Sequence, residues 1–374
     1  MNHIFCIVLC ALWTLSSFCT PLFDQHRDLA TKIPYIALAQ LPTPVEECRN
    51  LEKALQHPHL FIKRDDLAGS DTLYGGNKAR KLEFLLADAV QKGAKKIITY
   101  GCVGTNHGLA TACYAHQLGL DCLLMLKHQP NSPVVRQNLL LDHYFGAEIA
   151  LFANNAERNT AAQALLQSND EIYFFPTGGS IPLGALGFVN AAFELKEQIE
   201  KGQLPKPDYI YIAIGSCGTT AGLLLGLTMA NIDSKIIAVG VEPEWAPDCF
   251  LEKTKSLFAD TNQLMHNLSD TIPLYAFPDT QLEINKRFCT TNYGVWTPET
   301  DAATALMIET EHIVMEGTYS AKVIVALQED IQQSIRKPND IILIWNTYCG
   351  LDFSHLTRTV NYKNLPAQVH GYFE

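Results

Sequence analysis

The stretch Tyr209–Gly222 reads YIYIAI, followed directly by GSCGTTAG. Its first six residues form a short apolar run, which predicts a strand that is buried on both faces of a sheet. The glycine-containing turn after it leads into an apolar helix, expected over Thr219–Met229. A strand that passes through such a turn into a helix is typical of a parallel sheet covered by helices. This stretch therefore predicts an α/β fold.

The same alternation of apolar runs and helical periodicity extends through the chain from about residue 58. In the helix expected over Lys78–Gln91, Leu82, Leu85, Leu86 and Ala89 recur on one face. Further strands are expected at His59–Lys63, Lys96–Tyr100, Cys122–Leu126, Glu148–Phe152, Tyr173–Phe175, Lys235–Val241 and Ile341–Trp345, and further helices at Asn106–Gln117, Val134–Tyr144, Leu183–Glu200, Thr297–Glu316 and Lys322–Ser334. The pattern predicts parallel sheets with helices on both faces, and the length of 374 residues suggests more than one domain.

The composition is that of a globular protein. Hydrophobic residues make up 47% of the chain, which argues against disorder. The formal net charge of -11 repels phosphate backbones, so nucleic acid is not an expected partner. The eleven cysteines include no C-x-x-C pair and most lie in apolar runs, so we expect buried thiols and no metal site.

The first twenty residues differ from the rest. Ile4–Phe18 is an uncharged apolar run, too short for an ordinary membrane span and similar in length to a signal-peptide core. Ser17 and Cys19 supply the small residues that precede a cleavage site before Thr20. We therefore expect residues 1–20 to be a signal peptide and the protein to be exported, either periplasmic or secreted. The alternative is a cytoplasmic enzyme with a mis-assigned start or an uncleaved anchor. No later segment reads as a membrane span.

A second glycine-rich turn, Gly75–Lys81 (GGNKARK), opens the Lys78–Gln91 helix and follows Lys63–Asp66 (KRDD). Lys78 falls in the first helical turn, beside exposed backbone N–H groups, where a positive charge is disfavoured. The pKa of its amine would tend to fall there, and imine formation requires a neutral amine. The alternative is an ordinary exposed lysine, with Arg80 and Lys81 on a solvated helix face.

Two other turns could bind anions. The turn at Gly215–Gly222 has neither G-x-G-x-x-G spacing nor a P-loop lysine, so a small phosphate held by backbone fits it better than a dinucleotide or a nucleoside triphosphate. The turn at Gly101–His107 follows a strand, and Thr105 or Asn106 can cap the next helix. Such a cap would leave N–H groups free for a carboxylate, although capping alone also explains the asparagine.

Taken together and in this order, these segments resemble the pyridoxal-phosphate enzymes of the tryptophan synthase β fold type. The resemblance is to the branch that contains D-cysteine desulfhydrase and 1-aminocyclopropane-1-carboxylate deaminase. It extends from about Leu41 to about Phe353 and is most specific at Lys63–Asp66 and Gly75–Glu83. It implies pyridoxal 5'-phosphate as the cofactor, a small amino acid as the substrate and a homodimer as the assembly.

The resemblance also implies two domains. Residues 36–80 and 181–374 are expected to form a large cofactor-binding domain, and residues 81–180 a small domain.

Individual residues receive roles from the same resemblance. Lys78 is expected to carry the cofactor as an imine, Lys81 to lie near its phosphate, and Asn106 to contact its ring hydroxyl. The loop that contains Thr105, where the family has serine, is expected to bind the substrate carboxylate. The residues of the family's phosphate loop correspond to Gly215, Ser216, Cys217, Gly218 and Thr219.

Two further segments resemble the tyrosine-bearing segments of the family, Asn292–Val295 and Thr318–Lys322. Tyr293 and Tyr319 are therefore candidates for handling the substrate thiol or its proton. The alternative for both is packing with a satisfied hydroxyl.

The chain departs from the family pattern at three places. Cys217 replaces a glycine of the phosphate loop, and Glu316–Tyr319 stands where Asp-Pro-x-Tyr is usual. Asn346–Cys349 stands where the family has His-Thr-Gly-Gly, so Tyr348 and Cys349 could shrink or reshape the pocket.

Ser320 and Thr347 form the pair that resembles the D-cysteine desulfhydrases. Ser320 is expected to face the pyridine nitrogen, where the deaminases have a glutamate. A neutral hydroxyl leaves the ring a shallower electron sink, which suffices when a good leaving group departs from the β-carbon. We therefore expect elimination on D-cysteine to pyruvate, sulfide and ammonia. The alternatives are 1-aminocyclopropane-1-carboxylate deamination, β-replacement, and a relative that binds amino acid or cofactor without turnover.

Overall fold

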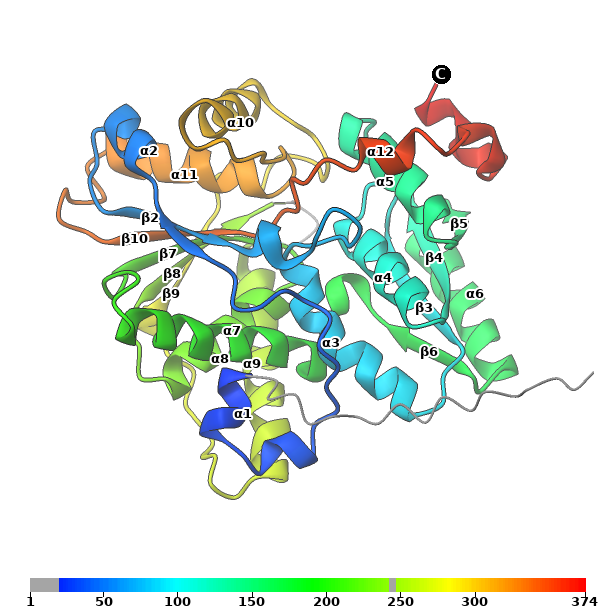
Figure 1. Cartoon of the computed structure of the whole chain (residues 1–374), viewed down its shortest axis with the longest axis horizontal. Helices are drawn as coiled ribbons and strands as arrows, with labels where there is room; N and C mark the ends of the chain where they lie inside the picture. Colours follow the sequence, from blue (N-terminus) through cyan, green and yellow to red (C-terminus); the bar gives the residue numbers. More distant parts are fainter. Residues whose placement is uncertain (1–19, 242–246) are drawn as a thin grey trace, which may run out of the picture.

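The structure, a computed structural model, describes residues 20–241 and 247–374 and contains two sheets (Figure 1). The strands of the six-stranded sheet, in the order β1-β2-β10-β7-β8-β9, are β1 Val45–Glu47, β2 Leu60–Arg64, β10 Ile342–Asn346, β7 Tyr209–Ile214, β8 Lys235–Gly240 and β9 Leu282–Asn285. Those of the four-stranded sheet, in the order β5-β4-β3-β6, are β5 Glu148–Phe152, β4 Asp121–Lys127, β3 Lys96–Cys102 and β6 Ile172–Phe175.

Helices cover both faces of each sheet. In Figure 1, α10 (Pro298–Glu311) and α11 (Ser320–Gln332) lie on one side of the six-stranded sheet, and α7 (Pro182–Glu200), α8 (Gly218–Met229) and α9 (Pro247–Leu268) on the other. The remaining helices are α1 Pro21–Gln25, α2 Arg49–Leu55, α3 Asn77–Gln91, α4 Asn106–Gln117, α5 Pro133–Tyr144, α6 Asn155–Ser168 and α12 Ser354–Thr357. The expected α/β fold with helices on both faces is confirmed.

The larger sheet is mixed, which differs from the expectation of parallel sheets. Its strands β2, β10, β7, β8 and β9 pair in parallel, but β1 pairs antiparallel with β2, Val45 opposite Lys63. Neither β1 nor β9 was expected, because each is only three or four residues long and carries polar residues. All pairs of the smaller sheet are parallel.

Helix α6 was not expected either. Its sequence, NAERNTAAQALLQS, is mostly polar, and among its residues only Arg158 and Ala162 are buried. Ala162 packs with Ile98 and Met125 of the smaller sheet, and the partly buried Ala161 and Leu165 pack beside it, so a narrow apolar stripe holds the helix to that face. Such a narrow apolar stripe gives little periodic signal in the sequence.

Helix α3 lies in the interior and has no solvated cationic face. Leu82, Leu85, Leu86 and Ala89 are buried together as expected, but Arg80 and Lys81 are also fully buried. The alternative of a solvated helix face for these two cations is therefore wrong. Arg80 is kept inside by carboxylates that come from other elements, Asp65 and Glu194.

The described cysteines are free thiols. Five of them are buried, as expected for small apolar side chains, whereas Cys249 is exposed. Among the described residues, no helix combines the length and apolarity needed to cross a bilayer. The expected signal peptide falls on residues 1–20, of which all but Thr20 lie outside the described residues.

Candidate active site

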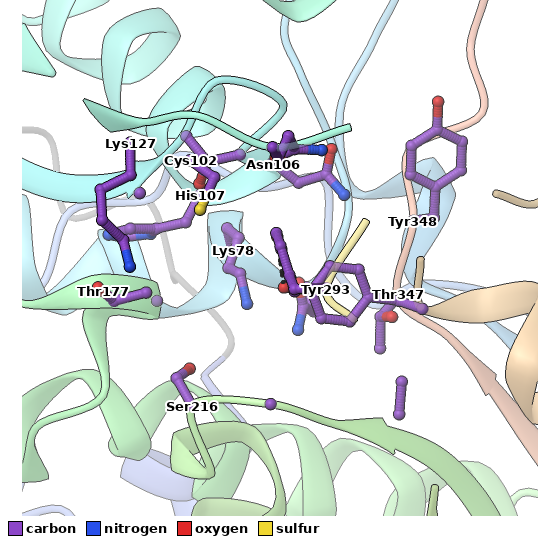
Figure 2. A pocket seen from close by; sticks show the side chains of 18 of the residues that line it. Lys78, Cys102, Asn106, His107, Lys127, Thr177, Ser216, Tyr293, Thr347 and Tyr348 are labelled. Atoms are coloured by element: carbon purple, nitrogen blue, oxygen red, sulfur yellow. Dashed lines mark hydrogen bonds between the residues drawn. The ribbon is translucent and has the colours of Figure 1, made fainter. Parts of the chain in front are cut away.

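A cavity of about 380 Å³ opens where the carboxyl ends of strands from both sheets meet (Figure 2). Parallel α/β sheets place ligands at these strand ends, because the glycine turns and helix N-termini collect there. The sequence-predicted residues that line it are Lys78, Thr105, Asn106, Gly215, Ser216, Tyr293, Tyr319 and Thr347. The other predicted residues do not line it, namely Lys81, Cys217, Gly218, Thr219 and Ser320.

Lys78 enters the cavity from the first turn of α3. Gly76 precedes the helix with φ +81°, and a Cβ there would meet the Thr347 carbonyl at 2.8 Å, so the turn requires glycine. The backbone N–H of Asn77 donates to the same carbonyl at 3.1 Å. The first turn of α3 is thus fixed against the end of β10, and in Figure 2 the Lys78 side chain points into the space above Ser216.

The Lys78 amine has no charged partner among the described residues. Burial lowers its pKa to about 8, because the protein interior disfavours the charged form. A substantial fraction of the amine is therefore neutral near neutral to mildly basic pH, which is the state needed for nucleophilic attack or proton abstraction. The sequence predicted the lowered pKa from the helix start, whereas the structure attributes it to burial.

The β7–α8 turn forms one end of the site. Cys217 adopts a left-handed conformation, φ +70°, so the turn tolerates a side chain where the family has glycine. Its thiol lies away from the cavity, within 3.4 Å of the Gly215 carbonyl oxygen. The N-terminus of α8 follows at Gly218, and Asn77 Nδ2 donates to Thr219 Oγ1 at 3.1 Å.

Lys81 lies behind this turn. Its Nζ donates to the Gly178 carbonyl at 3.1 Å and to Ser180 Oγ at 3.4 Å, and a Cβ on Gly218 would lie 2.9 Å from it. Burial, and secondarily the neighbouring Lys78, holds the pKa of Lys81 well below its usual value. Ser180, which the sequence did not single out, connects Lys81 to the β7–α8 turn. Its hydroxyl donates to Ser216 Oγ at 2.7 Å and accepts the Gly218 N–H at 3.2 Å.

The Thr105–His107 loop forms the opposite wall. Thr105 caps α4, because its side chain accepts the Gly108 N–H at 3.1 Å. Asn106 follows it and lines the cavity. His107 is 2% exposed, and burial together with Lys78 and Lys81 keeps its pKa well below the usual value, so the imidazole is neutral.

The tautomer of His107 follows from its partner. The Thr99 hydroxyl lies 3.0 Å from His107 Nε2 and donates its single proton to the Phe175 carbonyl at 2.9 Å. Nε2 must therefore carry the proton, and Nδ1 is a buried acceptor without a partner among the described residues.

The two tyrosines meet at the cavity. Tyr319 Oη donates to Tyr293 Oη at 2.9 Å, and the rings stand edge to face with centroids 5.9 Å apart. Tyr319 precedes α11 and is held by Glu316, whose carboxylate accepts the N–H groups of Thr318 at 2.8 Å, Tyr319 at 2.7 Å and Ser320 at 3.3 Å. Glu316, which stands at the Asp of Asp-Pro-x-Tyr, thus keeps a carboxylate that caps the helix.

Ser320 completes this cap from the other direction. Its Oγ accepts the Glu316 N–H at 3.0 Å, and the side chain is 2% exposed. The hydroxyl in turn donates to the Glu316 carbonyl oxygen at 3.5 Å. The contact with a ring nitrogen stays a prediction.

The Asn346–Cys349 departure does not close the cavity. Thr347 and Tyr348 both line it, but in Figure 2 the Tyr348 hydroxyl points away from Lys78. Cys349 is buried outside the lining, and its Sγ accepts the Gly75 N–H at 3.3 Å. The two side chains in place of glycines therefore reshape the rim and brace the turn before Lys78.

Several lining residues were missed by the sequence analysis. Extending the strand-end rule to β4 would have found the run from Lys127 to Pro130, because β4 ends at Lys127. Arg158 and Asn155 come from the unexpected helix α6 and had no sequence signal. Thr177 and Gly178 were also missed, whereas four further lining residues fall inside segments that the sequence singled out but received no role: Asn77, Cys102, Ala213 and Asn292.

Comparison with known proteins places this site in a family. The family profile described as "Pyridoxal-phosphate dependent enzyme" matches residues 36–347. The chain belongs to this family. It is 31% identical over 325 residues to a D-cysteine desulfhydrase of Salmonella newport, covering 85% of this chain and 94% of that protein. It is 35% identical over 243 residues to a putative 1-aminocyclopropane-1-carboxylate deaminase of Pyrococcus abyssi, covering 63% of this chain and 71% of that protein.

Solved structures agree with this assignment. A crystal structure of an ACC deaminase homologue superimposes with a TM-score of 0.74 at 29% identity, covering 92% of this chain and 97% of that one. A threonine deaminase from Solanum lycopersicum shares the fold, with a TM-score of 0.58 at 18% identity. This pyridoxal-phosphate enzyme therefore belongs to the group that contains ACC deaminase and D-cysteine desulfhydrase.

The residues present fit pyridoxal phosphate. The Ser216 hydroxyl, the N-terminus of α8 and the buried Lys81 amine form a donor set suited to a phosphate group. The Lys78 amine, with its pKa of about 8, suits covalent attachment of the cofactor. The described lining contains no aspartate or glutamate that would repel the phosphate.

Proposed function

We propose that this pyridoxal-phosphate enzyme eliminates the thiol from D-cysteine, taking up one water and releasing pyruvate, hydrogen sulfide and ammonia. One observation carries the choice of reaction: in the described part of the chain, no carboxylate lines the cavity. The nearby carboxylate of Glu316 is engaged by three backbone N–H groups behind the wall. By resemblance to the family, Ser320, a neutral hydroxyl, is expected to face the pyridine nitrogen.

Bound pyridoxal phosphate supplies an electron sink for the bond that breaks at the substrate α-carbon. Without a carboxylate to hold a proton on the ring nitrogen, that sink is shallow. Loss of a thiolate from the β-carbon needs less stabilisation than opening of a cyclopropane ring, because the electrons leave with sulfur. The neutral surroundings therefore favour elimination.

The chain's own residues cover the remaining steps. Lys78, neutral in part at mildly basic pH, can accept the proton from the substrate α-carbon. The N-terminus of α4, capped by Thr105, offers backbone N–H groups to the substrate carboxylate. The hydrogen-bonded phenols of Tyr293 and Tyr319 can hold or pass the proton that the departing thiolate takes up.

The proposal is tested by turnover of a small substrate panel. Purified wild-type protein is given D-cysteine, L-cysteine and 1-aminocyclopropane-1-carboxylate, and pyruvate and 2-oxobutyrate are measured. We expect pyruvate from D-cysteine and little or no 2-oxobutyrate. Efficient ring opening by the wild type would favour the deaminase instead, and a change in cofactor absorbance without product would favour a silent relative.

A paired substitution sharpens the test. Ser320→Glu would place a carboxylate against the pyridine nitrogen, where an opposite charge commonly shifts a pKa by about one to three units. Thr347→Leu would add apolar contact for cyclopropane methylenes. We expect the double variant to lose elimination rate and gain some ring opening. If Ser320→Ala leaves elimination unchanged, the role given to this position is wrong.

A further inference from the structure

Asn106 is held from behind by two buried side chains. Its Oδ1 accepts the Tyr74 hydroxyl at 3.1 Å and the Asn138 Nδ2 at 3.1 Å. Tyr74 is 1% exposed and Asn138 is 0% exposed, and neither lines the cavity. Both partners therefore contact Asn106 from the side away from the cavity.

The direction of both hydrogen bonds is fixed. An amide oxygen only accepts, so the Tyr74 hydroxyl must donate. Burial holds the pKa of Tyr74 well above its usual value, so that proton is always present. Asn138 is oriented in turn, because its Nδ2 also donates to the Gly104 carbonyl at 3.0 Å.

These contacts decide what Asn106 shows to a ligand. Its carbonyl oxygen has two lone pairs, and both are engaged behind the cavity wall. The Nδ2 end of the amide, the donor end, is therefore the one left for the cavity. An amide without this support could rotate by half a turn and present oxygen, which would repel an anionic ligand oxygen.

We propose that Tyr74 and Asn138 are positioning residues that lock Asn106 as a hydrogen-bond donor to the ring oxygen of the bound cofactor. The inference rests on the proposed cofactor site and not on the choice of substrate. Neither residue touches the ligand, and both act through the orientation of one amide.

The test uses the colour and affinity of the holoenzyme, which do not depend on turnover. Tyr74→Phe removes one donor and keeps the ring that stacks on Phe353. A weaker donor leaves the ring oxygen more basic, so the pH midpoint of the visible absorption should rise by about half to one unit. The affinity for pyridoxal phosphate should fall about five-fold.

The chain supplies a matched control. Tyr114 is also a fully buried tyrosine in the same core, and its hydroxyl has no partner among the described residues. Tyr114→Phe deletes the same hydroxyl without touching Asn106, and should leave the midpoint and the affinity unchanged. Asn138→Ala, which removes the other donor, should shift both quantities in the same direction as Tyr74→Phe.

A double-mutant cycle separates positioning from a general structural role. In an Asn106→Ala background, Tyr74→Phe should have no further effect on midpoint or affinity, because its target is gone. An unchanged effect in that background, or a wild-type spectrum in both single variants, would overturn the inference alone. A wild-type protein that never takes up pyridoxal phosphate would overturn the proposed cofactor site and the inference with it.

Discussion

Helix α3 buries cations in two contrasting surroundings within four residues. Arg80 lies in an ion cluster, where its guanidinium donates to Asp65 at 2.7 Å and to Glu194 at 2.9 Å. Lys63 joins the same cluster through Glu194 at 2.5 Å, and all four side chains are 0–2% exposed. Lys78 and Lys81, on the cavity side, have no carboxylate partner among the described residues.

The difference shows how partners decide the state of a buried cation. Burial opposes the charge of Arg80, but Asp65 and Glu194 outweigh it and hold the pKa of Arg80 well above its usual value. Desolvation without a counterion lowers the pKa of the half-buried Lys78 to about 8. The paired charge of Arg80 is therefore structural, whereas the unpaired amine of Lys78 is suited to act as a base or nucleophile.

The largest expected effect comes from Lys78→Met. The variant should lose at least about 1,000-fold in turnover, because both the attachment of the cofactor and the proton acceptor are removed. Its thermal midpoint should be unchanged or higher, since a desolvated amine is replaced by an apolar side chain. Borohydride reduction of the wild type followed by peptide mapping should label Lys78. A label on Lys81 or Lys322 would contradict the assignment.

Arg80→Met makes the same replacement two residues away with the opposite outcome. It leaves Asp65 and Glu194 buried without their main partner, which should lower the free energy of unfolding by about 3–5 kcal/mol. Urea unfolding followed by circular dichroism measures the change, with Lys78→Met as the matched control. Equal stability of the two variants would break the comparison.

The ion cluster also predicts a dependence of stability on pH. Burial alone would raise the pKa of Glu194, but Arg80 and Lys63 lower it to about 2. A carboxyl whose pKa is lower in the folded state stabilises the protein when the pH is above the pKa of the unfolded state, about 4.5. This contribution of about 3 kcal/mol is lost as the pH falls from about 4.5 towards 2. Unfolding curves measured at several values between about pH 6 and about pH 3 give the free energy of unfolding at each pH. This free energy should depend less steeply on pH for Glu194→Gln than for the wild type.

Lys81→Met is expected to have a smaller effect than Lys78→Met, Arg80→Met or Glu194→Gln. The amine sits behind the phosphate turn, so its loss should weaken pyridoxal-phosphate binding about ten-fold, as for the loss of one hydrogen-bond donor. Stability without the cofactor should change little compared with Arg80→Met. Spectroscopic titration with the cofactor gives the affinity, and a loss of stability as large as that of Arg80→Met would show that Lys81 is structural.

The sequence by itself determined the α/β fold, the turn that carries Lys78 and the turn at Gly215. These features depend on local requirements: alternation of apolar residues, glycine at tight turns and free N–H groups at helix starts. The same local character explains the small errors. Short polar strands such as β1 and β9, and the weakly amphipathic α6, lack a periodic signal and were not expected. Helix α9 was also not expected, although its 22 residues are amphipathic.

Only the tertiary structure decided which side chains meet. The spacing on α3 predicts neither that Arg80 is buried nor that its carboxylates come from Asp65 and Glu194, 114 residues away in the second case. The support of Asn106 by Tyr74 and Asn138 likewise joins three separate segments. Periodicity tells which face of an element is buried, but the partner across that face is set by how distant elements pack, and the charge state of each buried group follows from that partner.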